Sequence, residues 1–268
     1  MARRLYWEHL PCNLHGMPWD FVLLLLILGV AVPWRSAVRM RQLMHSPTTT
    51  SERRLAIYAG TIVFQWLAAG VALWRALARG ISPHSLGLAL DNPLPTLGIS
   101  AGLSAFLAAT QLYGLRQLGG LPPREQGFAG VLARKLLPQN LVEVLAFIAL
   151  VATVSVCEEF LYRGFVFAAI GRASGSVVAA ALVSTAFFSL GHVYQGVKGL
   201  TSTFVLGLVF CALRIFTGSL APCVTVHFCV DLVAGLAAPS LLGLGDPLRR
   251  GPQMSSASRP EAVERHDE

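Results

Sequence analysis

Two adjacent carboxylates lie in the middle of an apolar stretch of this chain. Glu158 and Glu159 are followed by Arg163, inside residues 141–193 that are otherwise apolar enough to lie in lipid. A charged side chain at the centre of a membrane helix costs roughly 2.5 to 3.5 kcal/mol on insertion scales, so such groups need internal partners or a water-filled cavity. The three residues therefore indicate either a functional site or a buried ion pair that only fixes helix packing.

Helical spacing separates the two glutamates. Residues four apart lie about 40° from each other around a helix axis, and residues five apart lie about 140° apart. Glu159 therefore faces Arg163 for an ion pair, whereas Glu158 has no local countercharge and shares its face with Tyr162, which could hydrogen-bond to it. A carboxylate of this kind is suited to act as a general base near neutral pH. We therefore interpret Glu158 as the catalytic candidate and Glu159 with Arg163 as its support.

Two further apolar segments carry ionisable groups. His192 lies four residues after Phe188, and Asp231 lies four residues after His227. A lone histidine on an apolar helix is more often a packing residue than a catalytic one. Here three separate helices each carry ionisable groups. The arrangement with the lowest free-energy cost in a membrane brings these groups together in one central cavity, where they can pair with one another. We therefore expect these groups to converge.

The same residue types could also hold a metal ion. Two histidines together with Glu and Asp could serve as zinc ligands, but the chain has no H-E-x-x-H motif. The five cysteines form no C-x-x-C pair, and most lie within apolar runs, as small buried side chains do. Cys157 has no activating base beside it in sequence. The sequence favours a site without metal or other cofactor, and a zinc-dependent membrane protease is the alternative.

Composition indicates an integral membrane protein. The 268 residues are 54% hydrophobic and 13% charged, with a mean hydropathy of +0.60, whereas soluble domains carry about 25% charged residues. We predict an all-α, polytopic transmembrane bundle of about seven to eight helices with an intramembrane polar cavity. Residues 1–140 would form N-terminal helices and loops, residues 141–244 the catalytic helices of the same unit, and residues 245–268 a disordered tail.

Hydropathy and turn signals predict where the helices lie. The predicted membrane segments are residues 19–34, 55–77, 96–115, 141–170, 176–193, 202–216 and 220–236. The fourth, at about 30 residues and about 45 Å, exceeds the roughly 30 Å hydrocarbon core, so it should be strongly tilted or broken near Gly164. Pro239 is expected to start a short last helix. The first segment has no small-x-small cleavage site after it, which is typical of a signal anchor rather than a cleaved signal peptide.

The formal charge of +7 comes from arginines at the ends of apolar runs. This distribution is typical of juxtamembrane loops and excludes nucleic acid as a partner. The expected partners are the lipid bilayer and a membrane-associated protein or peptide substrate. Arg-rich residues 35–54 and 116–138 are predicted to be cytoplasmic loops, which favours an outside amino terminus, whereas Arg3 and Arg4 favour the opposite orientation. The Arg/Ala/Leu/Gly bias suggests a bacterial inner membrane.

The three motifs together resemble a known family. Residues 158–163 match the E-E-x-x-x-R motif, residues 188–192 the F-x-x-x-H motif and residues 227–231 the H-x-x-x-[N/D] motif of the CPBP family. These are the CAAX proteases and bacteriocin-processing enzymes, also called the Abi family of glutamate-type intramembrane proteases. The resemblance covers about residues 141–236, and Leu-Gly-Leu at 86–88 is similar to a short segment that often precedes a helix in bacterial members.

The resemblance implies a polar catalytic cavity within the membrane and a role for each matching residue. Glu158, assisted by His192, would activate a water to attack a scissile carbonyl, while His227 and Asp231 would stabilise the oxyanion. The candidate catalytic residues are therefore Glu158, His192, His227 and Asp231, and the supporting residues are Glu159, Arg163, Phe188 and Tyr162.

Asp231 departs from the prenyl-protein proteases, which carry Asn at this position. An amide can donate a hydrogen bond to an oxyanion, and an ionised carboxylate cannot. Either Asp231 is protonated, or it orients His227 while His227 donates. We favour the second, because a carboxylate beside His227 would keep that ring cationic.

Two other classes of function remain as alternatives. A non-catalytic membrane scaffold or immunity-type binding protein could keep the polar groups for packing or for partner binding. A transporter with a proton-relay carboxylate is the third option, but the chain lacks the inverted repeats that are common in that class.

Overall fold

The computed structural model describes residues 16–46, 49–90 and 93–245. Within these ranges the chain is helical and has no strand, in agreement with the predicted fold class. The predicted disordered tail lies, apart from its first residue, outside the described residues. The elements are α1 (Trp19–Leu26), η2 (Ile27–Ala31), α2 (Val32–His45), α3 (Ser51–Ala78), α4 (Pro93–Gly119), α5 (Gly127–Leu136), α6 (Leu141–Glu159), η3 (Phe160–Val166), α7 (Phe167–Ser174), α8 (Val177–Gly191), η4 (Val193–Gln195), α9 (Gly196–Thr217) and α10 (Ala221–Leu241).

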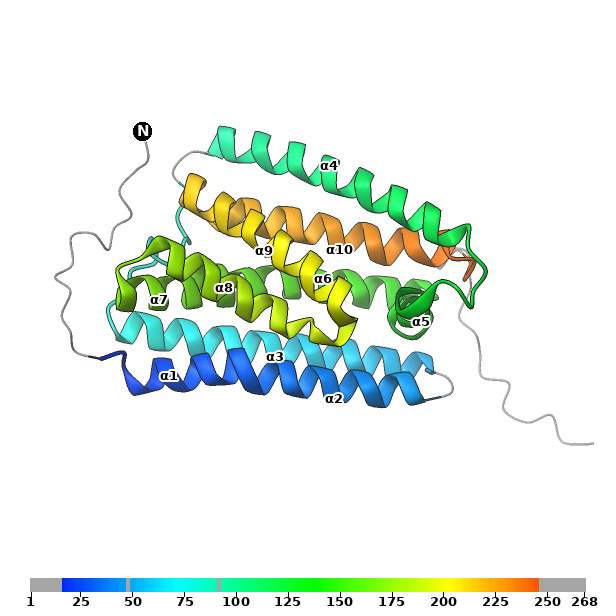
Figure 1. Cartoon of the computed structure of the whole chain (residues 1–268), viewed down its shortest axis with the longest axis horizontal. Coiled ribbons are helices and arrows are strands. Elements are labelled where there is room, and N and C mark those ends of the chain that lie inside the picture. Colours follow the sequence, from blue (N-terminus) through cyan, green and yellow to red (C-terminus); the bar gives the residue numbers. More distant parts are fainter. Residues whose placement is uncertain (1–15, 47–48, 91–92, 246–268) are drawn as a thin grey trace, which may run out of the picture.

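These elements join into long rods that lie roughly side by side. α1, η2 and α2 form one continuous rod, and α6, η3 and α7 form another, so the described residues make eight helices (Figure 1). Six of these are long and apolar enough to cross a membrane, and α8 is a shorter apolar helix. Together with the apolar composition, they make the protein an integral, multi-pass membrane protein.

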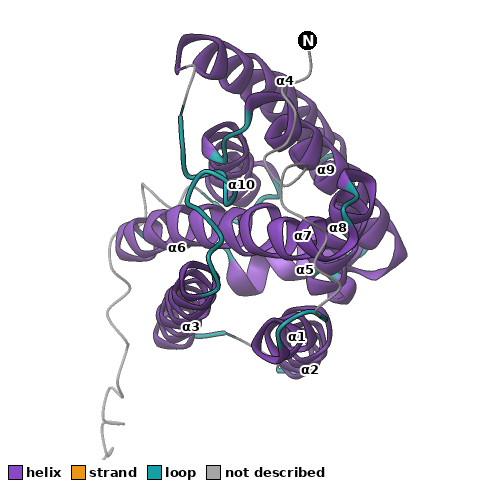
Figure 2. Ribbon diagram, turned by 90° about the vertical axis from the view of Figure 1, so that its left-hand side faces the viewer, coloured by secondary structure: helices purple, strands orange, loops and turns teal. Residues whose placement is uncertain are grey.

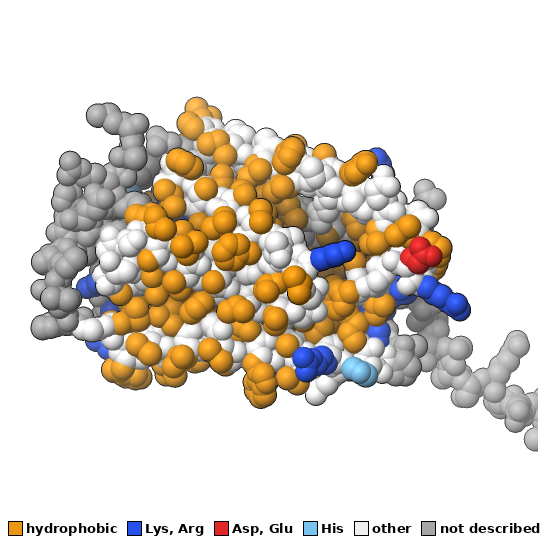
Figure 3. Space-filling model, in the orientation of Figure 1, with side chains coloured by type: hydrophobic (Ala, Val, Ile, Leu, Met, Phe, Trp, Pro, Cys, Tyr) orange, Lys and Arg blue, Asp and Glu red, His pale blue; other side chains and the backbone are white. Residues whose placement is uncertain are grey.

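The outer surface is suited to lipid. Large apolar side chains such as Trp34, Phe106 and Phe216 are exposed on the outside of the bundle. In Figure 3 apolar side chains cover most of the visible face, and most of the charged side chains in view gather at its right-hand end. In water such a surface would be an aggregation liability, whereas in a bilayer it faces hydrocarbon tails.

Three predicted boundaries were wrong. Most of the predicted loop 35–54 is helical, because the first rod continues to His45 and α3 begins at Ser51. The predicted loop 116–138 contains α5 after its Pro122-Pro123 break. Pro239 lies inside α10 and does not start a new helix. Each boundary was predicted from a charged or proline-containing run at the end of an apolar segment. The length of an apolar segment does not show how far its helix continues beyond the hydrocarbon layer.

The long rod of α6, η3 and α7 is continuous, but it changes to a π-helix around Gly164, where a tilt or a break was predicted. Residues Phe160–Val166 form the π-helical segment η3, which includes Gly164. A Cβ on Gly164 would lie 3.1 Å from the backbone oxygen of Leu86 and 3.3 Å from the ring of Phe160. The loop that carries Leu86 thus packs directly against the backbone at the π segment, so glycine is required there for close approach.

Two ion-pair clusters, each around a buried carboxylate, join the rods near their ends. Asp20 of α1 contacts Arg75 at 2.5 Å and Arg79 at 3.2 Å on α3. At the other end of α3, Arg54 makes two hydrogen bonds, at 2.8 and 2.9 Å, with the fully buried Glu143 of α6. These pairs set the position of α3 along α1 and α6.

The core of the bundle lies around the catalytic rod. α6 packs against α3 on one side and against α10 on the other, which Figure 2 shows in a view along the bundle. α8 packs against α7 and α9, and the turn η4 follows its last residue. The motif-bearing segments α6, α8 and α10 are therefore neighbours around one interior.

Candidate active site

The two glutamates lie near the middle of the longest rod. Glu158 is about 26 Å from Leu141 along the rod, at about 1.5 Å per residue, and the rod extends from Leu141 to Ser174. Glu159 is completely buried, whereas Glu158 is half-buried. Neighbouring positions on one helix point in different directions, so one carboxylate is enclosed and the other reaches the accessible side of the rod.

Glu159 is enclosed by two cationic groups. Arg163 Nη1 donates to Glu159 Oε1 at 3.0 Å, which is the i,i+4 pair that helical spacing indicates. His227 Nδ1 on α10 donates to the same oxygen at 2.8 Å. The guanidinium of Arg163 also lies 4.1 Å from the centre of the Phe188 ring, a cation–π contact that is strong when desolvated. Glu159 therefore joins α6 to α10 as well as to Arg163.

Glu158 has a different environment. Its Oε1 accepts a hydrogen bond from Nε2 of Gln65, on α3, at 2.9 Å. Its Oε2 is shielded and receives no donor from the described residues. Glu158 interacts electrostatically with His192, His227 and Asp231. The structure thus places the other three predicted catalytic residues around the half-buried Glu158, whose hydrogen-bond partner is Gln65 and not Tyr162.

His192 lies at the C-terminal end of α8, where the helix gives way to η4. Its Nδ1 donates to the carbonyl oxygen of Phe188, one turn earlier, at 2.9 Å. Because Nδ1 carries the hydrogen in that contact, Nε2 of the neutral ring is the free acceptor. The backbone carbonyl one turn earlier therefore sets the tautomer of His192, and the F-x-x-x-H spacing places the Phe188 ring beside the imidazole, with ring centroids 4.9 Å apart.

The ring of Phe188 is the packing centre of the site. It contacts the rings of Tyr162, His192 and His227 at centroid distances of 5.6, 4.9 and 6.0 Å. Tyr162 itself is buried, and its carbonyl accepts a hydrogen bond from Ser184 of α8 at 2.8 Å. Phe188 and Tyr162 thus lie where supporting residues would have to lie.

His227 has a carboxylate at each ring nitrogen. Nδ1 faces Glu159, and Nε2 lies 3.4 Å from Oδ2 of Asp231, whose side chain is 39% exposed. A ring nitrogen that faces a carboxylate oxygen must carry a hydrogen, because both atoms would otherwise present lone pairs. This geometry favours an imidazolium at His227, with one N–H held in the core and the other directed to the accessible side.

Sequence reasoning missed two polar neighbours of this cluster. Gln65 is a buried amide inside the apolar run of α3, and Tyr194 in η4 interacts electrostatically with Glu158 and Asp231. Tyr194 is held against Phe128 of α5, with ring centroids 6.4 Å apart. An amide within an apolar membrane segment is itself a signal, since such groups are costly without a partner. Nothing in the sequence could have indicated that α5 packs on η4.

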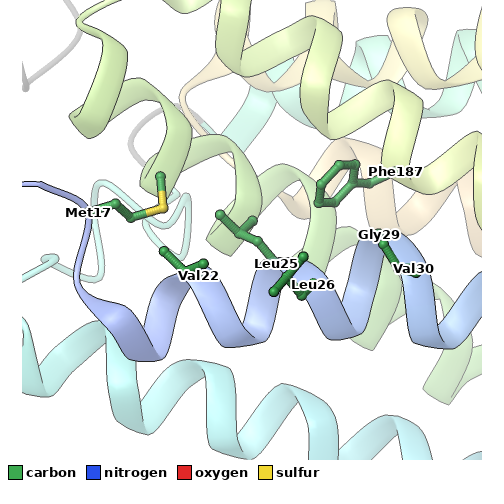
Figure 4. A pocket seen from close by; sticks show the side chains of 7 residues that line it. All are labelled: Met17, Val22, Leu25, Leu26, Gly29, Val30 and Phe187. Atoms are coloured by element: carbon green, nitrogen blue, oxygen red, sulfur yellow. The ribbon is translucent and has the colours of Figure 1, made fainter.

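Among the described residues, no group of three or more His, Cys, Asp or Glu side chains is arranged to hold a metal ion. A separate groove lies between the first rod and α8 and is lined only by apolar residues and glycine (Figure 4). Its lining residues are Met17, Val22, Leu25, Leu26, Gly29, Val30 and Phe187. None of the ionisable groups of the site lines this groove.

Comparison with known proteins gives one match. Residues 140–233 match a family described as type II CAAX prenyl endopeptidase Rce1-like. No curated protein and no solved structure matched the chain. The matched residues include the paired glutamates, Arg163, both histidines of the cluster and Asp231. Residues 140–233 are thus similar to the Rce1-like family of type II CAAX prenyl endopeptidases, and the rest of the chain lies outside this match.

Proposed function

We propose that this protein is an intramembrane endopeptidase that hydrolyses a peptide bond of a membrane-associated protein or peptide through a water activated by Glu158. One observation carries the proposal. A carboxylate without a countercharge on its own helix face lies midway along a membrane rod, with one oxygen held by Gln65 and the other without a donor in the described part of the chain. Such a group is costly in a membrane unless it has a function.

Accessibility assigns different roles to the two glutamates. Glu159 is fully buried and shares one oxygen between Arg163 and His227. In both glutamates Oε2 receives no donor from the described residues, but only Glu158 is half-buried. A general base must reach the proton that it removes, so Glu158 is the base and Glu159 holds the helices and His227 in place.

The two histidines would have different roles, His192 at the attacking water and His227 at the carbonyl oxygen of the substrate. The Nε2 atom of His192 is free to accept a hydrogen bond, which suits it to hold the attacking water together with Glu158. His227 presents an N–H beside the accessible Asp231, which suits it to donate to the oxyanion that forms when water attacks the carbonyl. Removing one such donor typically costs about 10²–10³ in kcat.

Asp231 would act through His227. It lies at the outer nitrogen of the ring and, as a carboxylate, keeps that nitrogen protonated and oriented. The negative charge that develops in the transition state would then compete with Asp231 for the same hydrogen. No covalent intermediate is required, since the nucleophile is water, and we propose that no metal or other cofactor takes part.

The family description names type II CAAX prenyl endopeptidases. We propose that the substrate of this chain is a protein or peptide segment held at the membrane, and that the protein lies in a bacterial inner membrane. The decisive comparison is between membranes from cells that carry the native protein and cells that carry Glu158→Gln at equal abundance. A precursor should accumulate only with the variant, and purified native protein should cleave that precursor.

This comparison also distinguishes the protease from a scaffold. A scaffold or immunity-type protein needs the shape and packing of the site but not its base, and glutamine has nearly the same volume as glutamate. Identical membrane proteomes and full function of Glu158→Gln would therefore reject the protease and favour the scaffold.

A further inference from the structure

Gln65 is a buried amide in the middle of a membrane helix, and it contacts the proposed base directly. Its side chain is 8% exposed, and its Nε2 donates to Glu158 Oε1 at 2.9 Å. Only the amide nitrogen can face an ionised carboxylate, because the amide oxygen would place two acceptors against each other. The chemistry of the pair thus defines which way the amide points.

We infer that Gln65 is a positioning residue for the hydrolytic reaction: it fixes Oε1 of Glu158 so that Oε2 is presented to the attacking water. This inference rests on the proposed function and extends it to a residue on α3. Gln65 lies outside residues 140–233, so the family match does not include it. The four helices that build the site would then be α3, α6, α8 and α10.

The role is not explained by helix docking alone. α3 is already joined to α6 by the two hydrogen bonds between Arg54 and Glu143. It is joined again by the neighbour of Gln65, because Trp66 Nε1 donates to Thr153 Oγ1 at 3.2 Å. Gln65 differs from these contacts in one respect, since its partner is Glu158, the half-buried carboxylate that we propose as the base.

The expected effect of losing this contact follows from the flexibility of glutamate. Its carboxylate rotates broadly about the last side-chain bond, and a single hydrogen bond to one oxygen removes that freedom. Displacement of a reacting group by about 1 Å can cost about 10²-fold in rate. Without Gln65, Glu158 remains in the site but spends less time in the productive orientation, so kcat falls while substrate binding is retained.

The test compares two substitutions that each remove one hydrogen bond between α3 and α6. Gln65→Met keeps the length of the side chain and deletes the donor to Glu158, and Trp66→Phe deletes the donor to Thr153. The purified full-length proteins are assayed on the precursor that accumulates in Glu158→Gln membranes. Gln65→Met should lower kcat about 10- to 100-fold with KM changed less than about threefold, and Trp66→Phe should stay within about threefold of the native protein. Equal losses in both variants would overturn the inference, because helix docking would then explain them.

A coupling measurement shows whether Gln65 acts through Glu158. Shortening the base in Glu158→Asp moves its carboxylate out of reach of Gln65, so Gln65→Met should cost less than about threefold in that background. The same 10- to 100-fold loss in both backgrounds would overturn the inference. If Gln65→Met does not fold, Gln65→Asn, which keeps an amide but loses the reach, replaces it with the same expectations.

Failure of this inference is distinguishable from failure of the proposed function. Full cleavage of the precursor by Glu158→Gln would reject the proposed function itself. An inactive Glu158→Gln together with a fully active Gln65→Met would reject only the role of Gln65.

Discussion

His227 of α10 donates its Nδ1 hydrogen to Oε1 of Glu159 on α6 at 2.8 Å, the oxygen that also receives Arg163. The helix repeat identified one partner for Glu159, which was Arg163 on the same rod. Instead, the carboxylate links two helices in the interior of the bundle and holds the histidine that we propose as the oxyanion donor. Structural support and catalytic geometry therefore depend on the same atom.

Glu159→Gln should lower stability more than it lowers the activity of the folded molecules. The substitution removes the ion-pair partner of the fully buried Arg163 and one of the two carboxylates that face His227, and breaking a buried ion pair typically costs about 3–5 kcal/mol. The yield of monodisperse protein and the apparent Tm in detergent would measure the loss, with Glu52→Gln at an exposed position as the matched control. Native stability combined with complete loss of turnover would give Glu159 a direct part in the chemistry.

Asp231→Asn should keep turnover within about threefold, whereas Asp231→Ala should lower kcat by about 10- to 100-fold. An amide can donate to the oxyanion itself, and the contact between His227 and Glu159 remains to orient the ring. Alanine supplies neither a donor nor an orienting group. Steady-state kinetics on the accumulated precursor would decide, and an asparagine variant as impaired as the alanine variant would mean that the negative charge of Asp231 is required.

His192→Ala should reduce kcat by about 10²–10⁴, the range for a lost acid–base group, with little change in stability. The ring is half-buried at the end of α8, and among the described residues its side chain hydrogen-bonds only to the backbone carbonyl of Phe188, one turn earlier. His45→Ala, at the exposed end of α2, provides the control because its ring also bonds only a local carbonyl, that of Arg41. Turnover of His192→Ala comparable to that of the control would remove His192 from the mechanism.

Chelation should leave turnover unchanged. The described residues hold no group of three or more metal-ligating side chains, and the proposed nucleophile is activated by a carboxylate. Activity would be measured after extended treatment of the purified protein with a strong zinc chelator, and again after zinc is added back. Loss of activity that zinc restores would establish the zinc-dependent alternative.

Glu143→Gln should destabilise the bundle without changing the rate per folded molecule. Glu143 makes two hydrogen bonds with Arg54 and also accepts from the backbone N–H of Gln139. This cluster lies at the start of α6, about 23 Å along the helix from Glu158 at about 1.5 Å per residue. Thermal unfolding should show a loss of about 3 kcal/mol or more, and a lower kcat in the remaining folded protein would reveal unexpected coupling to the site.

Much of the fold could be predicted from hydropathy because lipid imposes a simple rule. Every backbone polar group in the hydrocarbon layer must be satisfied within its own helix, so an apolar run of sufficient length becomes a membrane helix. The predicted segment of residues 96–115 lies within Pro93–Gly119, and residues 202–216 lie within Gly196–Thr217. Helix ends were less predictable. Lys135 of α5 donates to the carbonyls of Leu43 and Met44 at the end of α2, a tertiary contact that no local pattern indicates.

The sequence alone determined which ionisable residues lie inside apolar segments, and these stand out because charges are costly in lipid. It also determined which of them share a helix face, because the helix repeat is fixed. It indicated the pair between Glu159 and Arg163 and singled out Glu158, His192, His227 and Asp231. Only the tertiary structure decided the partners between helices, namely His227 on Glu159 and Gln65 on Glu158. These contacts depend on the rotation and axial position of each rod against its neighbours, which are set by packing around Phe188, the π segment and the buried ion pairs, and not by any periodicity within one helix.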